Sequence, residues 1–165
     1  MRVLILKPKV DTKGSGDLVS RLGVRRPADL LVPPDMDLVE AVRAASSEGR
    51  PLACVLCDES QFLTAEQAEQ LFMVTVELNI PVICYGLRTD FKGELFPGSA
   101  ELLATADVIE EVKTICWCGK KALCNARFDE SGHVIKEGEQ VVLGANDKYI
   151  GLCRKHWKEG NLGPQ

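Results

Sequence analysis

The sequence predicts an α/β protein, in which helices cover both faces of a parallel β-sheet and a small β-hairpin appendage follows. Short apolar runs at residues 2–7, 52–57 and 80–85 alternate with amphipathic segments of helical period. Wholly apolar strands separated by helices are typical of parallel sheets that are buried on both sides. From residue 116 the apolar runs become short and alternate with polar residues, which favours antiparallel hairpins.

Composition bounds the class of protein. The 165 residues are 45% hydrophobic, and 20 Lys and Arg against 24 Asp and Glu give a formal charge of -4, which argues against general nucleic-acid binding. Seven cysteines, an odd number, favour buried thiols over a secreted disulfide framework. The first residues do not form a signal peptide, and apolar runs are too short to span a membrane. We therefore expect a cytoplasmic protein with no membrane partner.

Two helices have recognisable start signals. Asp37 and Glu40 form a capping pair after a Pro-Pro pair, and Thr64 and Gln67 form a capping box for a helix over residues 64–77. We expect the apolar side chains of this second helix to face the sheet, namely Ala68, Leu71, Phe72 and Val76.

A further helix and strand complete the first part of the chain. We expect the helix at residues 99–105 and the strand at residues 108–115. The glycine-rich loop before them, residues 86–98, follows a strand and is a candidate wall for a ligand.

Asp58 and Glu59 come directly after the apolar run at residues 52–57. Ligands of open parallel sheets bind beyond the carboxyl ends of the strands. There Asp58 could hold Mg²⁺, directly or through water, and Glu59 could take a proton from an attacking hydroxyl. Alternatively, the two residues lie in a solvated loop in which Asp58 or Glu59 caps the next helix, although Thr64 and Gln67 already supply a capping box for that helix.

A metal-ligand pattern brackets the second part of the chain. Cys116, Cys118, Cys153 and His156 make a Cys₃His set, which suits structural zinc. The first pair, C-x-C, is one residue shorter than the usual spacing, so Cys124 is an alternative to Cys118. The competing interpretations are buried cysteines beside a surface histidine, or a zinc-ribbon interaction domain; nearly balanced charge over residues 110–159 gives no support for nucleic-acid binding.

Taken together, these features show that the sequence resembles the type II thymidine kinases over residues 2–159. The most specific passages are Asp-Glu-Ser-Gln-Phe at 58–62, Cys-Tyr-Gly-Leu-Arg-Thr-Asp-Phe at 84–91 and Gly-Glu-Leu-Phe-Pro-Gly at 93–98. Further matches lie at residues 113–116, at 138–144, and from 147–149 into Cys153.

The resemblance implies a fold and a reaction. It implies a core related to the P-loop ATPases at residues 1–112, a zinc-bearing lasso domain that closes over thymidine at 113–159, and a disordered tail at 160–165. Members transfer the γ-phosphoryl group of ATP to the 5′-hydroxyl of thymidine and usually form homotetramers. The implied cofactors are ATP, Mg²⁺ and structural Zn²⁺.

The resemblance also implies residue roles. Glu59 resembles the general base, Asp58 the strand-end partner of Mg²⁺, and Asp11 and Lys13 residues near the phosphates. The implied nucleoside-binding residues are Phe91, Phe96, Val141, Val142, Leu143, Gly144 and Tyr149. Lys13 stands where the family more often has arginine, and lysine lacks the bidentate phosphate contact of arginine. Ala145 stands where the family commonly has a second glycine, and alanine restricts the backbone of the lasso.

The sequence departs from the family most in its phosphate-binding loop. The 165 residues contain no G-x-x-x-x-G-K-[ST] motif, which family members carry on a first strand and helix before the position that matches Met1. We expect Met1 to be an internal methionine of a longer kinase. The alternative is a truncated, catalytically incompetent protein that binds thymidine or other subunits.

Overall fold

The computed structural model describes residues 1–10, 16–20, 22–141 and 148–164. These fall into two units, each described by itself. The α/β unit comprises Met1–Arg88 and Phe96–Asp107, and the C-terminal unit comprises Thr89–Leu95 and Val108–Gln165. None of the helices in the described ranges is both long and apolar enough to cross a membrane.

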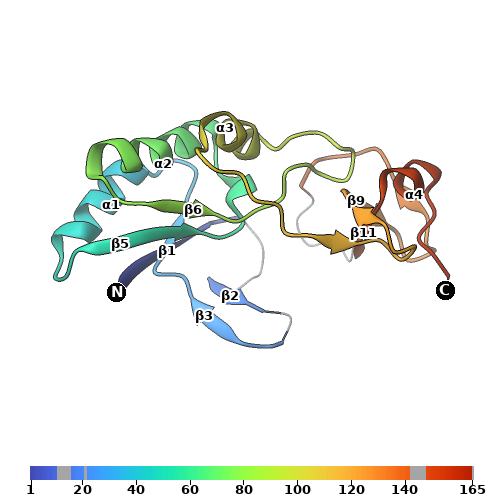
Figure 1. Cartoon of the computed structure of the whole chain (residues 1–165), viewed down its shortest axis with the longest axis horizontal. Coiled ribbons are helices and arrows are strands. Elements are labelled where there is room, and N and C mark those ends of the chain that lie inside the picture. The colour runs from blue at the N-terminus through green and yellow to red at the C-terminus, as the bar shows by residue number, and fades with distance from the viewer. Residues whose placement is uncertain (11–15, 21, 142–147, 165) are drawn as a thin grey trace. The chain divides into compact units, whose positions relative to one another are not determined.

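The α/β unit contains a four-stranded parallel sheet, as the sequence predicts (Figure 1). Its order is β4-β1-β5-β6, and each neighbouring pair is parallel. The strands are β1 (Arg2–Pro8), β4 (Leu30–Val32), β5 (Leu52–Cys57) and β6 (Val82–Cys84). Between β1 and β4 the chain forms a separate antiparallel pair, β2 (Asp17–Val19) and β3 (Arg25–Pro27).

The predicted caps begin two of the helices of this unit. The carboxylate of Asp37 accepts a 3.0 Å hydrogen bond from the Glu40 amide at the start of α1 (Leu38–Ser47). Thr64 and Gln67 exchange both bonds of a capping box at the start of α2 (Ala65–Leu78). The remaining helical segments of the unit are η1 (Ser60–Phe62) and α3 (Pro97–Thr105).

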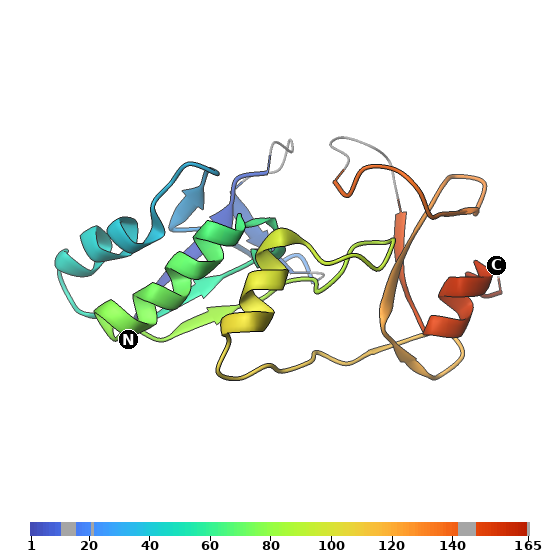
Figure 2. The same cartoon turned by 90° about the horizontal axis from the view of Figure 1, so that it is seen from above.

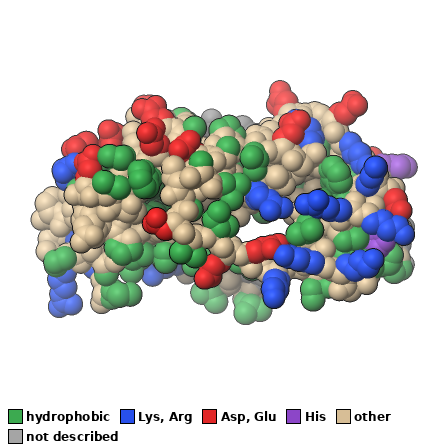
Figure 3. Space-filling view, turned by 45° about the horizontal axis from the view of Figure 1, so that its top comes forward, with side chains coloured by type: hydrophobic (Ala, Val, Ile, Leu, Met, Phe, Trp, Pro, Cys, Tyr) green, Lys and Arg blue, Asp and Glu red, His purple; other side chains and the backbone are tan. Residues whose placement is uncertain are grey.

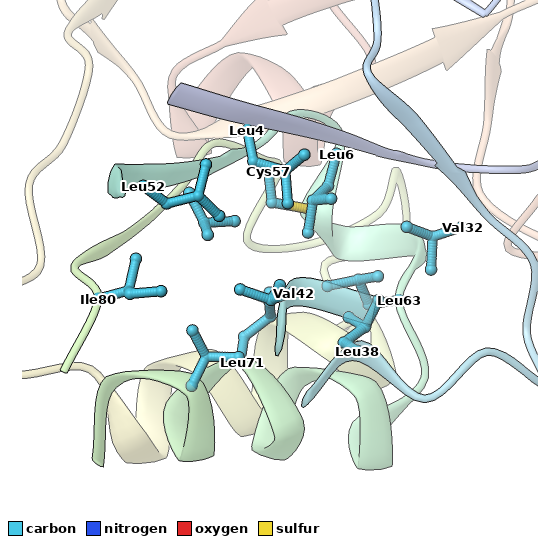
Figure 4. Close-up of a cluster of buried hydrophobic side chains, with 12 residues drawn as sticks. Leu4, Leu6, Val32, Leu38, Val42, Leu52, Cys57, Leu63, Leu71 and Ile80 are labelled. Carbon is cyan, nitrogen blue, oxygen red and sulfur yellow. The ribbon is translucent and has the colours of Figure 1, made fainter. Parts of the chain in front are cut away.

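The main core lies between one face of the sheet and the helices (Figure 4). Leu38 and Val42 of α1 and Leu71 of α2 point toward the strands, and each is almost fully buried. The strands contribute side chains of alternate residues, among them Leu4, Leu6, Val55 and Cys57. Burying one such aliphatic side chain contributes roughly 1.5–3 kcal/mol, so this layer holds the unit together.

The described helices of the α/β unit cover one face of its sheet. Figures 1 and 2 show α1, α2 and α3 on the same side, so the prediction of helices on both faces is wrong for these residues. On the opposite face, Ile5 is buried. Its amide donates to the Asp29 carboxylate, and its carbonyl accepts from the Asp29 amide. Ile83, on the same face, is 46% exposed. An apolar strand requires apolar neighbours on each side but does not specify a helix.

The inward face of α2 also differs from the prediction. Ala68, Leu71 and Val74 are buried, whereas Phe72 is 39% exposed and Val76 is 60% exposed. Successive helical residues turn by about 100°, so a stripe through positions 68, 71 and 74 leaves positions 72 and 76 on the flank of the helix. The sequence gives the helical period, but several apolar stripes fit it.

The C-terminal unit is built on a three-stranded antiparallel sheet of order β10-β9-β11, of which β9 and β11 are labelled in Figure 1. Its strands are β9 (Cys124–Phe128), β10 (Val134–Ile135) and β11 (Lys148–Leu152), and α4 (Arg154–Glu159) follows. The predicted strand at 108–115 is reduced to β7 (Thr114–Ile115), which pairs with β8 (Lys121–Ala122). The side chains of Val108, Ile109 and Val112 are exposed, because the chain before β7 joins no described strand.

Candidate functional site

The carboxylates that follow β5 lie on a backbone that is fixed from two sides. The amide of Asp58 donates to Leu6 of β1 at 3.0 Å, and the amide of Ser60 donates to Tyr85 at 2.9 Å, just beyond β6. These bonds extend the parallel ladder past the end of β5, so the strand-end position of Asp58 and Glu59 is set by the sheet itself.

Glu59 has a left-handed backbone, with φ 53° and ψ 36°. Among the described non-glycine residues, Asn79 shares this conformation, but it is the C-cap of α2, where asparagine commonly adopts it. For glutamate the left-handed region costs roughly 1–2 kcal/mol. The surrounding contacts stabilise this conformation at the carboxylate for which the sequence predicts a chemical role.

Gln61 orients the Glu59 carboxylate. Its Nε2 donates to Glu59 Oε2 at 2.6 Å, and its Oε1 accepts from the Leu87 amide at 3.1 Å. The Gln61 side chain is 1% exposed, whereas Glu59 is exposed. A buried amide whose oxygen and nitrogen are both bonded cannot turn freely, so Gln61 holds one carboxylate oxygen in place.

Two glycines make room for this arrangement. A Cβ atom on Gly86 would lie 2.7 Å from Gln61 Oε1 and 2.8 Å from Ser60 Oγ. A Cβ atom on Gly98 would lie 2.6 Å from the carbonyl oxygen of Leu63. The loop after β6 and the start of α3 therefore approach residues 59–63 more closely than any side chain permits.

Phe96 is part of the same packing. It precedes Pro97 at the start of α3, is 5% exposed, and meets the ring of Phe62 edge-on with 5.7 Å between centroids. Ser99 Oγ donates to the carbonyl of Leu87 at 2.7 Å and fastens α3 to the loop that Gln61 also binds. Phe96 therefore has a clear packing role in the α/β unit, whatever else it contacts.

Phe91 belongs to the C-terminal unit, although it lies between β6 and α3 in the sequence. Its side chain is 2% exposed, the Arg127 guanidinium carbon lies 5.1 Å from its ring centroid, and Trp157 Nε1 donates to its carbonyl oxygen at 2.9 Å. The guanidinium over an aromatic face is a favourable cation–π arrangement.

Tyr149 lies on β11 directly opposite Arg127 of β9, so the two side chains project from the same face of the sheet. Its side chain is 56% exposed and is available to a ligand. Val141 is half-buried. The other predicted site residues lie outside the described residues, namely Asp11, Lys13, Val142, Leu143 and Gly144.

The predicted metal ligands come together. The ligand atoms of Cys116, Cys118, Cys153 and His156 all lie within 4.8 Å of one another. Cys116 Sγ is 3.4 Å from His156 Nδ1, and Cys118 Sγ is 4.0 Å from Cys153 Sγ. Neighbouring ligands around tetrahedral zinc are separated by about 3.3–3.8 Å. The donor types therefore suit such an ion, and donor atoms within 4.8 Å of one another need only draw slightly closer to bind it. Cys118 completes the group, and Cys124 does not.

Local structure explains this convergence. Cys116 and Cys118 lie in a tight turn in which the Gly119 amide donates to the Cys116 carbonyl, while Cys153 and His156 occupy the start of α4. Burial alone would raise the pKa of the Cys116 thiol, but hydrogen bonds from the Cys118 and Cys153 amides and from His156 outweigh it and lower the pKa to about 6. A thiol of this kind is a thiolate at neutral pH, the form that binds metal.

The surface of the C-terminal unit carries charges of both signs. Figure 3 shows Lys and Arg side chains among Asp and Glu side chains on its visible face. Lys121 forms an ion pair with Glu111, and Lys155 lies 3.9 Å from Glu159.

Sequence reasoning missed the residues that hold the site. Gln61, Arg127, Trp157, Asp90 and Gln140 act through partners that are distant in sequence, so spacing gives no sign of them. An interior glutamine in the run Asp-Glu-Ser-Gln-Phe is the one available indication, because a buried amide needs hydrogen-bond partners.

Comparisons with known proteins agree with the residue pattern. A family model described as thymidine kinase matches residues 1–157. A thymidine kinase of Ruegeria pomeroyi is 47% identical over 99% of this chain and 82% of its own length, and one of Salmonella typhimurium is 49% identical over 96% and 77%. A thymidine kinase of Enterobacteria phage T4 is 48% identical over 96% of this chain and 81% of its own length. The chain therefore belongs to the thymidine kinase family.

Proposed function

We propose that this protein is a thymidine kinase that transfers the γ-phosphoryl group of ATP to the 5′-hydroxyl of thymidine in the cytoplasm, as part of nucleoside salvage. Family membership supports the reaction, and the Glu59 geometry supports the position of its base. The observation that carries the proposal is the strained, exposed carboxylate of Glu59, held by the buried Gln61 amide at the end of a parallel strand.

Glu59 would act as the general base. Phosphoryl transfer requires the attacking hydroxyl to lose its proton, and a positioned carboxylate typically contributes 10²–10⁴-fold (about 3–5 kcal/mol). The carboxylate is exposed to incoming substrate, while its bond to Gln61 fixes one oxygen. An orientation held before the substrate arrives does not have to be established during the reaction.

Asp58 would hold the Mg²⁺ that accompanies ATP, directly or through water. By resemblance, Asp11 and Lys13 would lie near the phosphates, in a fold related to the P-loop ATPases. Magnesium bound with ATP neutralises charge on the transferring phosphoryl group. Asp58 is half-buried, and its amide is hydrogen-bonded to Leu6 of β1, so the backbone from which the carboxylate projects is held in place.

Phe91, Phe96 and Tyr149 would contact the nucleoside, together with backbone groups of residues 141–144. The support differs between them. Tyr149 has an exposed ring, whereas the burial of Phe91 and Phe96 means that they would present an edge at most. Thymine offers an apolar methyl group and an imide edge, which suit aromatic rings and fixed backbone groups respectively.

Zinc is the metal that the Cys₃His group fits best, and its role would be structural. All four protein ligands are present, so no position is left for a substrate. The binding free energy of such an ion contributes directly to folding, which a unit with so small a buried core needs. We also propose that residues 113–159 act as the substrate-closing lasso domain and that the enzyme is a homotetramer.

The direct test is a transfer assay with γ-labelled ATP, Mg²⁺ and thymidine, with titration calorimetry of thymidine in parallel. We expect labelled thymidine monophosphate. Thymidine binding without phosphoryl transfer would contradict the kinase proposal and favour the binding-protein alternative. If the chain neither binds thymidine nor transfers the phosphoryl group, both proposals are contradicted.

A further inference from the structure

We infer that Trp157 is a positioning residue that links the metal site to Phe91 and thereby sets the affinity for the nucleoside. The inference rests on the proposed function where it assigns Phe91 to nucleoside binding. Its basis is the C-terminal unit, which contains the segment Thr89–Leu95 as well as the metal ligands.

Trp157 contacts both ends of this link. It follows the ligand His156 in α4, and its amide donates to the carbonyl of the ligand Cys153 at 3.0 Å. Its indole Nε1 donates to the Phe91 carbonyl at 2.9 Å. The same ring lies against Gly93, where a Cβ atom would be 3.8 Å from Trp157 Cη2. One side chain therefore joins the first turn of the metal-bearing helix to the backbone of Phe91.

Other contacts fix the segment but do not reach the metal ligands. Asp90 Oδ1 accepts from the Lys92 and Glu94 amides, both at 2.9 Å, and closes the turn. Gln140 Nε2 donates to Asp90 Oδ2 at 3.1 Å and to the Leu95 carbonyl at 3.3 Å. With the turn fixed internally and at its end, the Trp157 bond ties the Phe91 backbone to α4, while Arg127 of β9 packs over the Phe91 ring.

Trp117 provides a matched comparison. Its ring stacks on the His156 imidazole, with 4.3 Å between centroids and 8° between planes. Its Nε1 donates to the Asn161 carbonyl at 3.2 Å instead of to Thr89–Leu95. Both tryptophans therefore adjoin the metal site, and both donate to a backbone carbonyl, but Trp157 alone of the pair donates to the segment that contains Phe91.

The two proposed roles separate binding from chemistry. Phe91 would contact the base of the nucleoside, whereas Glu59 would act at the sugar hydroxyl. Loss of the Trp157 bond should therefore raise the KM for thymidine and leave kcat and the KM for ATP nearly unchanged. Losing the net contribution of one hydrogen bond should raise the KM for thymidine about threefold to tenfold.

The test compares Trp157→Phe with Trp117→Phe in zinc-loaded chains. Each substitution keeps an aromatic ring and removes the N–H donor. For Trp157→Phe we expect unchanged zinc content, the KM increase for thymidine alone, and faster amide exchange in Thr89–Leu95. For Trp117→Phe we expect neither the KM change nor the faster exchange.

Three results would overturn the inference: unchanged exchange in Thr89–Leu95 for Trp157→Phe, equal effects of both variants, or loss of zinc from Trp157→Phe. A third variant guards against a packing effect of phenylalanine, because β-(3-benzothienyl)alanine at position 157 keeps the shape of indole without its donor and should reproduce the result. If the wild-type chain fails to phosphorylate thymidine, the proposed function fails, and the exchange measurement alone decides this inference.

Discussion

Gln61 Nε2 donates a 2.6 Å hydrogen bond to Glu59 Oε2, and the same buried amide accepts from the backbone of Leu87. The carboxylate at the end of β5 is thus coupled to the loop that follows β6. This coupling explains how an exposed glutamate keeps one orientation in a left-handed backbone. It also makes Gln61 a positioning residue that spacing arguments do not reveal.

Replacing Gln61 tests this coupling. Gln61→Leu removes both amide bonds at nearly constant volume, so Glu59 should lose its fixed orientation and kcat should fall by about tenfold or more. Steady-state kinetics with thymidine and ATP provide the measurement. Unchanged kcat in a folded variant would show that the bond is incidental.

Gly86 tests the close approach of the two loops. In Gly86→Ala the new Cβ atom would meet Gln61 Oε1 and Ser60 Oγ, so both stability and kcat should fall, with a stability loss of about 1–3 kcal/mol. Gly98→Ala is the comparison, because its Cβ atom would meet the Leu63 and Ser60 carbonyls but not the Gln61 amide, so it should affect mainly stability. Denaturant unfolding with parallel kinetics separates the two effects, and an unaffected Gly86→Ala would contradict the proposed packing.

The identity of the metal ligands can be tested with two cysteines. Cys118→Ser should lose zinc and destabilise the C-terminal unit, because Cys118 Sγ lies within the ligand group, whereas Cys124→Ser should retain zinc. Zinc content after gel filtration is the measurement. The opposite pattern would assign the second ligand to Cys124.

Metal retention should depend on pH in a defined direction. Hydrogen bonds lower the pKa of Cys116 from 9.0 to about 6, so the thiolate is favoured above that value and protons compete with metal below it. We expect the affinity for zinc to fall as pH falls, and to fall more steeply below about 6, where the Cys116 thiol also takes up a proton in competition with the metal. Competition with a chromogenic chelator at stepped pH measures this affinity, and an affinity that is the same at pH 7 and pH 5 would contradict the assigned thiolate.

The face that α2 presents to the core gives a matched stability test. Leu71→Ala should cost about 2–5 kcal/mol, because Leu71 is 1% exposed in the main core. Phe72→Ala, at a side chain that is 39% exposed, should cost clearly less. Equal losses would support the stripe predicted from sequence instead.

The sequence predicts the features that depend on short spacing. The caps at Asp37 and Thr64 and the metal pairs that contain Cys116 and His156 each rest on residues a few positions apart, and the structure confirms their proximity. By contrast, Gln61 and Leu87 are 26 positions apart, and Trp157 and Phe91 are 66 positions apart. Such contacts depend on tertiary packing, which no local pattern encodes.

The remaining errors have similar causes. Residues 108–115 have the apolar, β-branched character of a strand, but strand formation also needs a partner, and only β7 has one among the described strands. Whether Phe72 or Val74 joins Leu71 on the inward face of α2 depends on which neighbours pack against the helix. Propensity and period therefore give the type of element, while its extent and inward face are set by the rest of the fold.

Glu59→Gln tests whether Glu59 removes the proton from the thymidine hydroxyl. The amide keeps the size of the side chain but cannot accept that proton, and the exposed Glu69 of α2 provides the control Glu69→Gln. We predict that kcat falls by about 10²–10⁴-fold in Glu59→Gln while the dissociation constant for thymidine stays within about twofold, with no change in the control. Near-normal turnover in Glu59→Gln would contradict the assignment.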